Sequence, residues 1–75
     1  MSLFDVKTNK ICIIKKVDIE SENIKLRIME LGLFAGVKVE VKCKSLLKKT
    51  LLISCNSCCF TISNLIAKQI EVCYV

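Results

Sequence analysis

The chain has 75 residues, 53% of them hydrophobic, and 12 basic side chains against seven acidic ones give a formal net charge of +5. This length fits one domain, residues 1–75, whose core must be aliphatic because the sequence has only four aromatic residues. No apolar run approaches the roughly 20 residues that span a bilayer, no secretory signal follows Met1, and proline is absent. We therefore expect neither a membrane-spanning nor a disordered chain, but a cytoplasmic protein with reduced thiols.

The first expected elements are an irregular lead-in over residues 1–9, a strand over residues 11–17, and a helix. The β-branched side chains of residues 11–17 suit a pleated, largely buried backbone. Apolar residues then recur at the three- and four-residue spacing of a short amphipathic helix. They are Ile24, Ile28 and Leu31. We expect Ser21 to cap the start of this helix and Gly32 to end it in a left-handed conformation.

Strict alternation after a turn at Gly36 predicts the next strand. Valines and one cysteine occupy the odd positions of residues 37–43, and charged residues occupy the positions between them. This pattern indicates one buried and one solvated face. We therefore expect Cys43 to point into the core, as Val41 does. Residues 45–49 form a basic loop.

A hairpin is expected where strands over residues 50–55 and 58–62 flank a two-residue turn at residues 56–57. Period-two alternation then sets which pairs share a face of the sheet. The pairs expected to point inward are Cys55 with Cys58, Ile53 with Phe60, and Leu51 with Ile62.

The chain ends with one helical turn over residues 63–67 and a last strand over residues 69–74, whose alternation predicts that Tyr74 points inward. Five short antiparallel strands with an aliphatic interior favour a small closed barrel, because closure removes exposed strand edges. The predicted fold class is therefore mainly β, with one short α-helix between the first and second strands.

Short motifs mark the helix end, the following turn and the closing strand. They read Arg27, Glu30-Leu31-Gly32-Leu33, Gly36, alternating valines over residues 37–41, and Ala67-x-x-Ile70-x-Val72. Together they resemble the FeoA family. The chain departs from that family's pattern at Asn9, Ala35 and Ser57, where the family usually carries Gly, Pro and Gly.

The resemblance implies an SH3-like barrel that acts as a non-enzymatic accessory protein of ferrous iron uptake. It implies that the chain binds and modulates the FeoB-type membrane GTPase transporter, and that it reaches the membrane only through that partner. No small-molecule substrate is implied. The residues themselves also argue against an enzyme, because the sequence has no histidine, no Gly-rich phosphate loop and no paired acids at a recognisable spacing.

Two groups of residues are candidates for partner binding. Leu33 and Phe34 are apolar residues on a turn, beside the structural glycines Gly32 and Gly36, and exposed apolar patches tend to mark contacts. The second group is a basic cluster of Lys42, Lys44, Lys48 and Lys49. Such a cluster suits an acidic protein, an anionic leaflet or nucleic acid. We disfavour nucleic acid because stacking platforms need more aromatic residues.

Cysteine gives the remaining candidate chemistry. Cys55, Cys58 and Cys59 contain a C-x-x-C step, and thiolates are soft metal ligands. A structural zinc site normally has four ligands, however, and the other thiols fall on different strands. We favour core roles for Cys43 and Cys55, and expect no cofactor beyond weak binding of Fe²⁺ or Zn²⁺. A small basic nucleic-acid-binding barrel and a thiol-based metal-binding protein stay open as alternative functions.

Overall fold

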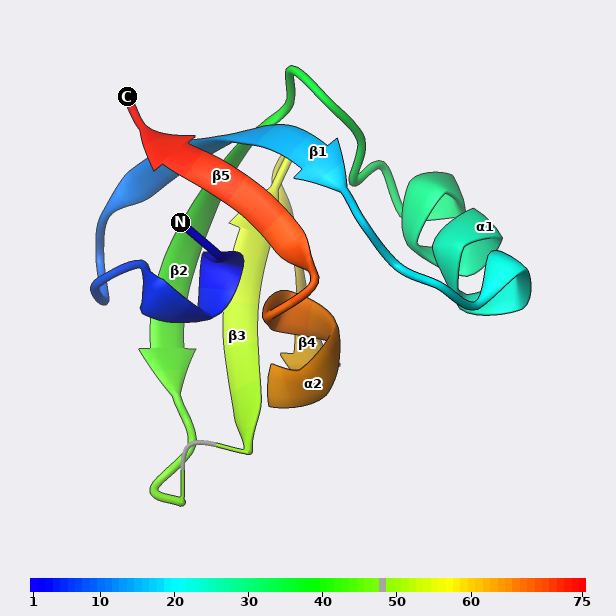
Figure 1. Cartoon of the computed structure of the whole chain (residues 1–75). Helices are drawn as coiled ribbons and strands as arrows, with labels where there is room; N and C mark the ends of the chain where they lie inside the picture. The colour runs from blue at the N-terminus through cyan, green and yellow to red at the C-terminus, as the bar shows by residue number, and fades with distance from the viewer. Residues whose placement is uncertain (48) are drawn as a thin grey trace.

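A computed structural model describes residues 1–47 and 49–75 as a curled antiparallel sheet (Figure 1). The described residues form five strands, hydrogen-bonded in the order β4-β3-β2-β1-β5. They are β1 (Ile11–Val17), β2 (Lys38–Lys44), β3 (Thr50–Cys55), β4 (Cys58–Ser63) and β5 (Ile70–Tyr74). The helical segments are η1 (Leu3–Asp5), α1 (Glu22–Glu30) and α2 (Asn64–Ala67). The predicted mainly β fold, with a short helix between the first two strands, is confirmed.

Aliphatic side chains from every strand fill the inside of the curled sheet. The N-terminal segment also contributes, because Leu3 and Val6 are fully buried around the single turn of η1. The sequence suggested only an irregular lead-in there. The buried core residues are Leu3, Val6, Cys12, Ile14, Ile19, Ile28, Leu33, Val39, Val41, Leu51, Ile53, Cys55, Ile62, Ala67, Ile70 and Val72.

The hairpin of β3 and β4 has the predicted register, with Cys55 opposite Cys58 and the pairs continuing to Thr50 opposite Ser63. The prediction that Cys58 points inward with Cys55 is wrong, because Cys58 is exposed where the strand leaves the turn. Asn56 (φ 50°) and Ser57 (φ 67°) form its turn. Both residues are left-handed, as a two-residue turn that follows the strand twist requires. Serine tolerates this conformation less well than glycine does.

The ends of α1 also follow the prediction. The Ser21 hydroxyl accepts a hydrogen bond from the Ile24 amide at 3.5 Å, which caps the first turn. Gly32 follows the helix with φ of 97°, and the Leu33 amide donates to the Ile28 carbonyl at 3.2 Å. This left-handed glycine reverses the chain direction towards β2.

A β-bulge in β2 makes the prediction for Cys43 wrong. Val41 lies opposite Ile53 on β3. Cys43 lies opposite Leu52, so Lys42 is an extra residue in the ladder. An extra residue reverses the alternation of faces beyond it. Cys43 is therefore exposed instead of pointing into the core.

The prediction for Tyr74 is also wrong, because 44% of this residue is exposed. Tyr74 lies near the end of β5, opposite Cys12. Its hydroxyl accepts a hydrogen bond from the Lys7 amide at 3.1 Å. A tyrosine hydroxyl needs a hydrogen-bonding partner. The partner here is the exposed Lys7 amide, so Tyr74 stays outside the core.

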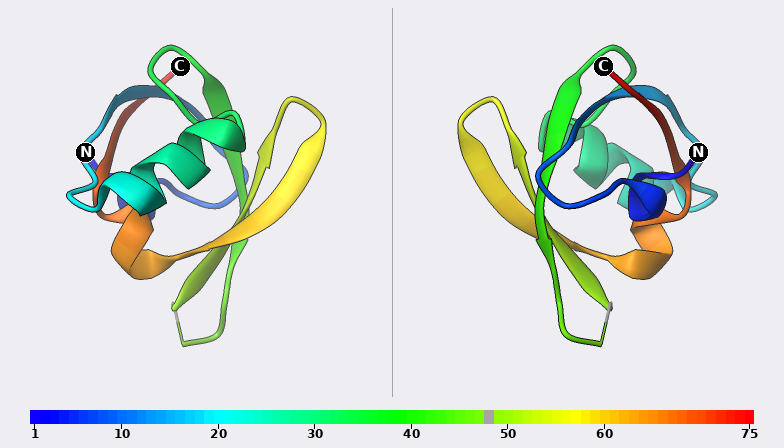
Figure 2. Two further views of the ribbon diagram at one scale, coloured as in Figure 1. Left: turned by 90° about the vertical axis from the view of Figure 1, so that its right-hand side faces the viewer. Right: turned by 90° about the vertical axis from the view of Figure 1, so that its left-hand side faces the viewer.

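The two outer strands of the sheet have different surroundings. On β5, Ser2 forms a bridge with Glu71, and the Val72 amide donates to the Met1 carbonyl at 2.7 Å. The N-terminal segment thus covers this edge. Within residues 1–47 and 49–75, no strand or bridge pairs with the outer side of β4. Figure 2 shows the β3–β4 hairpin, drawn in yellow, reaching out from the body of the barrel.

Candidate functional site

Helix α1 exposes most of its apolar side chains. It lies to one side of the barrel (Figure 1), and Ile28 is the residue that it buries in the core. More than two fifths of each of the following residues is exposed: Ile24, Leu26, Met29 and Leu31. A surface helix normally turns its apolar stripe inward. The exposed residues on α1 therefore mark a surface suited to contact with another molecule.

A groove of about 440 Å³ lies between α1 and β4. Its lining comprises Asn23, Ile24, Arg27, Ile28, Leu31, Thr61, Ile62, Ser63 and Ile66. Most of these side chains are apolar, and Arg27 is the one that carries a charge. Sequence reasoning missed this groove because its walls are at least 30 positions apart in the chain and meet only in the folded barrel.

The predicted docking pair on the turn after α1 is separated by the fold. Leu33 is fully buried, so its assignment to an exposed docking surface is wrong. Its burial follows from the turn at Gly32, which directs the next side chain into the barrel. Phe34 is 47% exposed, and a partner-binding role for it stays a prediction. Gly36 has φ of 93°, as a structural turn glycine would.

Two of the predicted basic residues already have partners within the chain. Lys42 Nζ lies 3.3 Å from Glu40 Oε1. Lys44 Nζ donates to the Phe4 carbonyl at 2.8 Å and lies 5.3 Å from the centre of the Phe4 ring. Lys49 is exposed, and Lys48 lies outside the described residues. Lys42 and Lys44 are thus less available to a partner than the sequence suggested.

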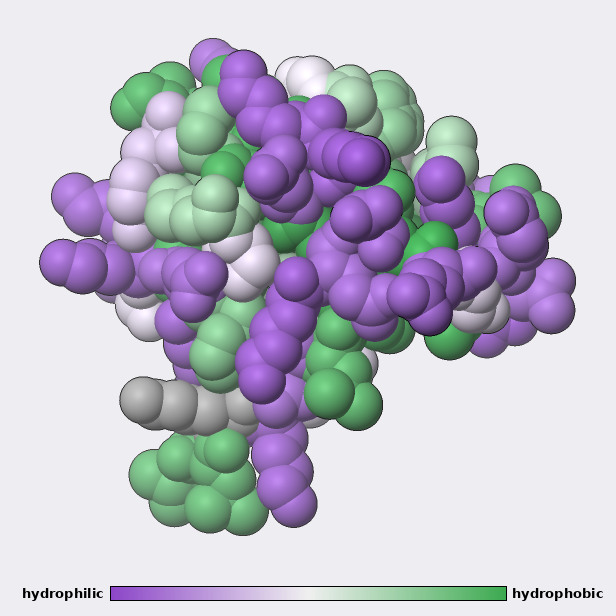
Figure 3. All heavy atoms as spheres, in the orientation of Figure 1, coloured by the Kyte–Doolittle hydropathy of each residue, from purple (hydrophilic) through white to green (hydrophobic). Residues whose placement is uncertain are grey.

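The loop between β2 and β3 also carries apolar residues. Leu46 and Leu47 are among the most exposed apolar side chains that the structure describes. Figure 3 shows hydrophobic atoms at the lower end of the molecule, where this loop lies. The loop that the sequence marked as basic therefore presents a mixed basic and apolar surface.

The cysteines differ in their surroundings. Cys12 and Cys55 are buried, Cys73 is half-buried, and Cys43, Cys58 and Cys59 are exposed. Burial, with a smaller effect of Cys73, raises the pKa of the Cys12 thiol to about 11. Burial also raises the pKa of Cys55, and Cys58 adds to that shift. The core role predicted for Cys55 is confirmed, and Cys12 is a core residue as well. Both thiols are poor nucleophiles.

The candidate ligands Cys55, Cys58 and Cys59 do not meet at one point. The Cys55 thiol points inward and donates to the Gly32 carbonyl at 3.9 Å. Cys58 and Cys59 are consecutive in β4, so their side chains leave opposite faces of the strand. Among the described residues, no group of three His, Cys, Asp or Glu side chains is placed to hold a metal ion. The three thiols do not fit a tetrahedral zinc site.

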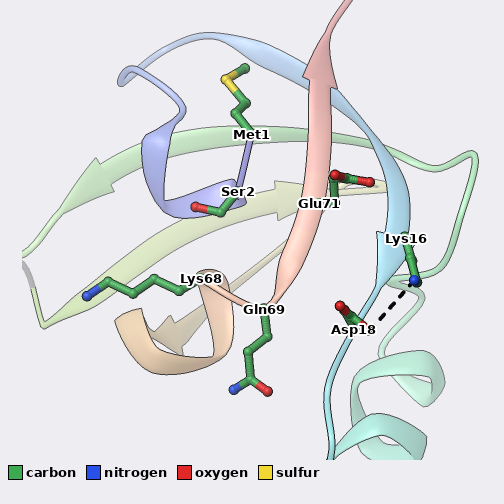
Figure 4. A pocket seen from close by; sticks show the side chains of 7 residues that line it. All are labelled: Met1, Ser2, Lys16, Asp18, Lys68, Gln69 and Glu71. Carbon is green, nitrogen blue, oxygen red and sulfur yellow. Dashed lines mark ion pairs between the residues drawn. The ribbon is translucent and has the colours of Figure 1, made fainter.

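Two other hollows are lined mainly by polar residues. One, of about 310 Å³, lies where the N-terminal segment meets β5. Figure 4 shows Met1 and Ser2 on one side of β5, and Lys16 and Asp18 on the other. Lys16 Nζ lies 3.9 Å from Asp18 Oδ1. The second hollow, about 590 Å³, is lined by Lys7, Asn9, Lys10, Ile11, Lys38, Tyr74 and Val75. Neither gathers side chains with the arrangement of a catalytic acid, base and nucleophile.

In the part of the chain that the structure describes, no helix has both the length and the apolar character needed to cross a bilayer.

Comparison with known proteins gives a family for the chain. Residues 1–73 match the FeoA domain. No match was found among the curated proteins.

Three solved structures show the fold. FeoA from Chlorobium tepidum has 25% identity and a TM-score of 0.93 over 100% of this chain and 70% of its own. Iron(II) transport protein A from Clostridium thermocellum has 20% identity and a TM-score of 0.92 over 100% of this chain and 46% of its own. FeoA from Stenotrophomonas maltophilia has 24% identity and a TM-score of 0.82 over 96% of this chain and 88% of its own. That protein is complexed with zinc and is described as an SH3 domain protein. The predicted SH3-like fold is thereby confirmed.

Proposed function

This chain belongs to the FeoA domain family, and we propose that it is a non-enzymatic accessory protein of ferrous iron transport. Its partner in this proposal is a FeoB-type membrane GTPase, which it binds and modulates from the cytoplasm. Two relatives support the transport role. The Clostridium thermocellum protein is an iron(II) transport protein, and the Stenotrophomonas maltophilia protein is described as a candidate activating factor of ferrous iron transport.

The observation that carries a binding role is the apolar surface of α1 beside the groove. Ile24 and Leu31 line the groove and are each more than two fifths exposed. Covering such surface with a partner is favourable by about 25 cal/mol per Å² of apolar area removed from water. An accessory protein needs a surface of this kind, and it needs no reactive centre of its own.

Charge supports a partner with an acidic surface. The formal net charge of +5 attracts acidic molecules at long range, and such attraction speeds encounter more than it strengthens the final complex. Arg27 places one positive charge inside the groove itself. We therefore expect complex formation to be faster at low salt.

The test is binding of the purified cytoplasmic GTPase region of the transporter from the same organism, measured by calorimetry. Ile24→Asp should weaken binding by tenfold or more, because a carboxylate would have to be desolvated in the apolar groove. Ile11→Asp is the matched control, since Ile11 is slightly more exposed than Ile24 but lies on β1 and does not line the groove. No binding by the folded wild-type chain would refute the proposed partner.

A further inference from the structure

Within residues 1–47 and 49–75, no segment pairs with the outer edge of β4, whereas Met1 and Ser2 cover that of β5. Natural proteins usually protect an open edge with charged side chains, proline or a covering segment. The six residues of β4 include no charged residue and no proline. An open, uncharged edge with β-forming side chains is ready to pair with another strand.

The backbone of β4 presents its free hydrogen-bonding groups at this edge. Antiparallel pairing alternates residues that bond to the neighbouring strand with residues that do not. In a hairpin with a two-residue turn, the residues on either side of the turn, here Cys55 and Cys58, form a hydrogen-bonded pair. Two residues further along β4, Phe60 therefore also bonds to β3. Cys59 and Thr61 instead direct their amide and carbonyl groups outward. In the described chain, neither Cys59 nor Thr61 has another backbone hydrogen bond.

This edge borders the groove between β4 and α1. Thr61, Ile62 and Ser63 form the strand wall of the groove, and α1 forms the opposite wall. A strand added about 4.8 Å from β4 would therefore run along the groove. Its side chains on one face would meet the exposed Ile24 and Leu31.

We propose that the β4 edge and α1 bind an extended segment of a partner protein, which adds to the sheet as a sixth strand. The segment carries apolar side chains that pack on α1 and an acidic side chain that faces Arg27. Backbone hydrogen bonds supply affinity in this mode of recognition, and side-chain pockets supply specificity. The inference rests on the proposed function, and it adds the binding mode and the chemistry of the recognised segment.

Charge favours a partner segment over a second copy of this chain. Among the described residues Arg27 forms no ion pair. If two copies joined through their β4 edges, each groove would receive an uncharged strand. Arg27 would then be covered without a counter-charge, which carries a desolvation cost. An acidic and apolar segment avoids that cost.

The sharpest test removes one outward hydrogen-bond donor. Thr61→Pro deletes the amide hydrogen that points away from β3, so the bonds of the β3–β4 hairpin remain. Thr61→Val keeps the amide and is the matched control. The probes are overlapping 12-residue peptides that cover the cytoplasmic region of the transporter. We expect at least one acidic, apolar peptide to bind the wild-type chain and Thr61→Val equally, and Thr61→Pro about tenfold more weakly.

A second measurement does not depend on how the proline variant folds. Hydrogen exchange of the Thr61 amide in the wild-type chain should slow when the peptide is bound, because that amide gains an acceptor. The inference is overturned if no peptide binds, or if bound peptides leave the exchange of Thr61 unchanged.

The outcomes also separate this inference from the proposed function. If the intact cytoplasmic region binds Thr61→Pro as tightly as wild type, the accessory function stands and the β4 edge is not its docking site. If that region does not bind the wild-type chain, both proposals fail. Sedimentation that shows a wild-type dimer and a Thr61→Pro monomer would assign the edge to a second copy and overturn the inference.

Discussion

The thiol of Cys12 is fully buried between strands and donates to the Val39 carbonyl at 3.5 Å. A thiolate at that position would lose its hydration and gain no compensating charge. This explains why burial is the main cause of its raised pKa, with Cys73 as the smaller cause. Cys43, Cys58 and Cys59 are exposed to solvent instead. The fold thus gives identical side chains different solvation.

Cys12 should make the stability of the barrel fall at alkaline pH. The thiol has a pKa of about 11 when folded and about 9 when unfolded. Its contribution to the free energy of unfolding is therefore complete below pH 9. As the pH rises from 9 to 11, that contribution is lost and the free energy of unfolding falls by about 2 to 3 kcal/mol. Urea unfolding of the wild-type chain and of Cys12→Ala, followed by circular dichroism under reducing conditions, measures this difference. Parallel pH profiles for the two chains would contradict the prediction.

At the scale of elements, α1 depends on very few contacts with the barrel. The sequence predicted an amphipathic helix with the apolar stripe Ile24, Ile28 and Leu31. All three residues line the groove, but the fold buries Ile28 and leaves Ile24 and Leu31 more than two fifths exposed. A nine-residue helix is only marginally stable by itself in water. Ile28 therefore holds the element that forms one wall of the proposed binding surface.

Truncation of Ile28 should cost far more stability than the same truncation at Ile24. Ile28→Ala removes buried methyl groups and leaves a cavity, so we expect a loss of about 2 to 4 kcal/mol. Ile24→Ala removes the same atoms from an exposed site and should change stability by less than about 0.5 kcal/mol. Urea denaturation of both variants compares them directly. Equal losses would mean that α1 packs by another face.

Element-level features were predictable where local chemistry determines them. The positive φ values at Asn56 and Ser57 follow from a two-residue turn, and Ser21 and Gly32 bound α1 through local capping. The bulge at Lys42 was not predictable, because the residues around it alternate without interruption in the sequence. The twist needed to curl a sheet determines where such a bulge falls.

At the scale of the whole molecule, the barrel was predictable and the candidate site was not. Aliphatic alternation and tight turns depend on neighbours in sequence, so they identify strands. The groove depends on where α1 lies relative to β4, and Leu33 is buried by the way the chain turns after the helix. The placement of α1 and the burial of Leu33 both arise from tertiary packing. The sequence therefore directed attention to Leu33 and the lysines, and did not show that Arg27 and Thr61 line one groove.

The distribution of thiols over the molecule predicts no tight metal site. Cys55 points into the core, while Cys58 and Cys59 leave opposite faces of β4. Addition of Zn²⁺ or Fe²⁺ to the reduced chain should leave its melting temperature unchanged, because a ligand stabilises the folded state only when it binds that state more tightly than the unfolded one. Thermal melting with and without metal, with the chelator-treated chain as control, measures this. A saturable rise in melting temperature together with loss of titratable thiols would show the prediction to be wrong.

Tyr74 has a practical consequence for every experiment proposed above. It is the only tyrosine in a sequence without tryptophan, and its hydroxyl accepts from the amide of Lys7, which is 67 positions away. Its fluorescence therefore reports on the contact between the N-terminal segment and β5. The chain carries an intrinsic optical probe of barrel closure, and a tryptophan in any bound partner can be excited at longer wavelength without background from this protein.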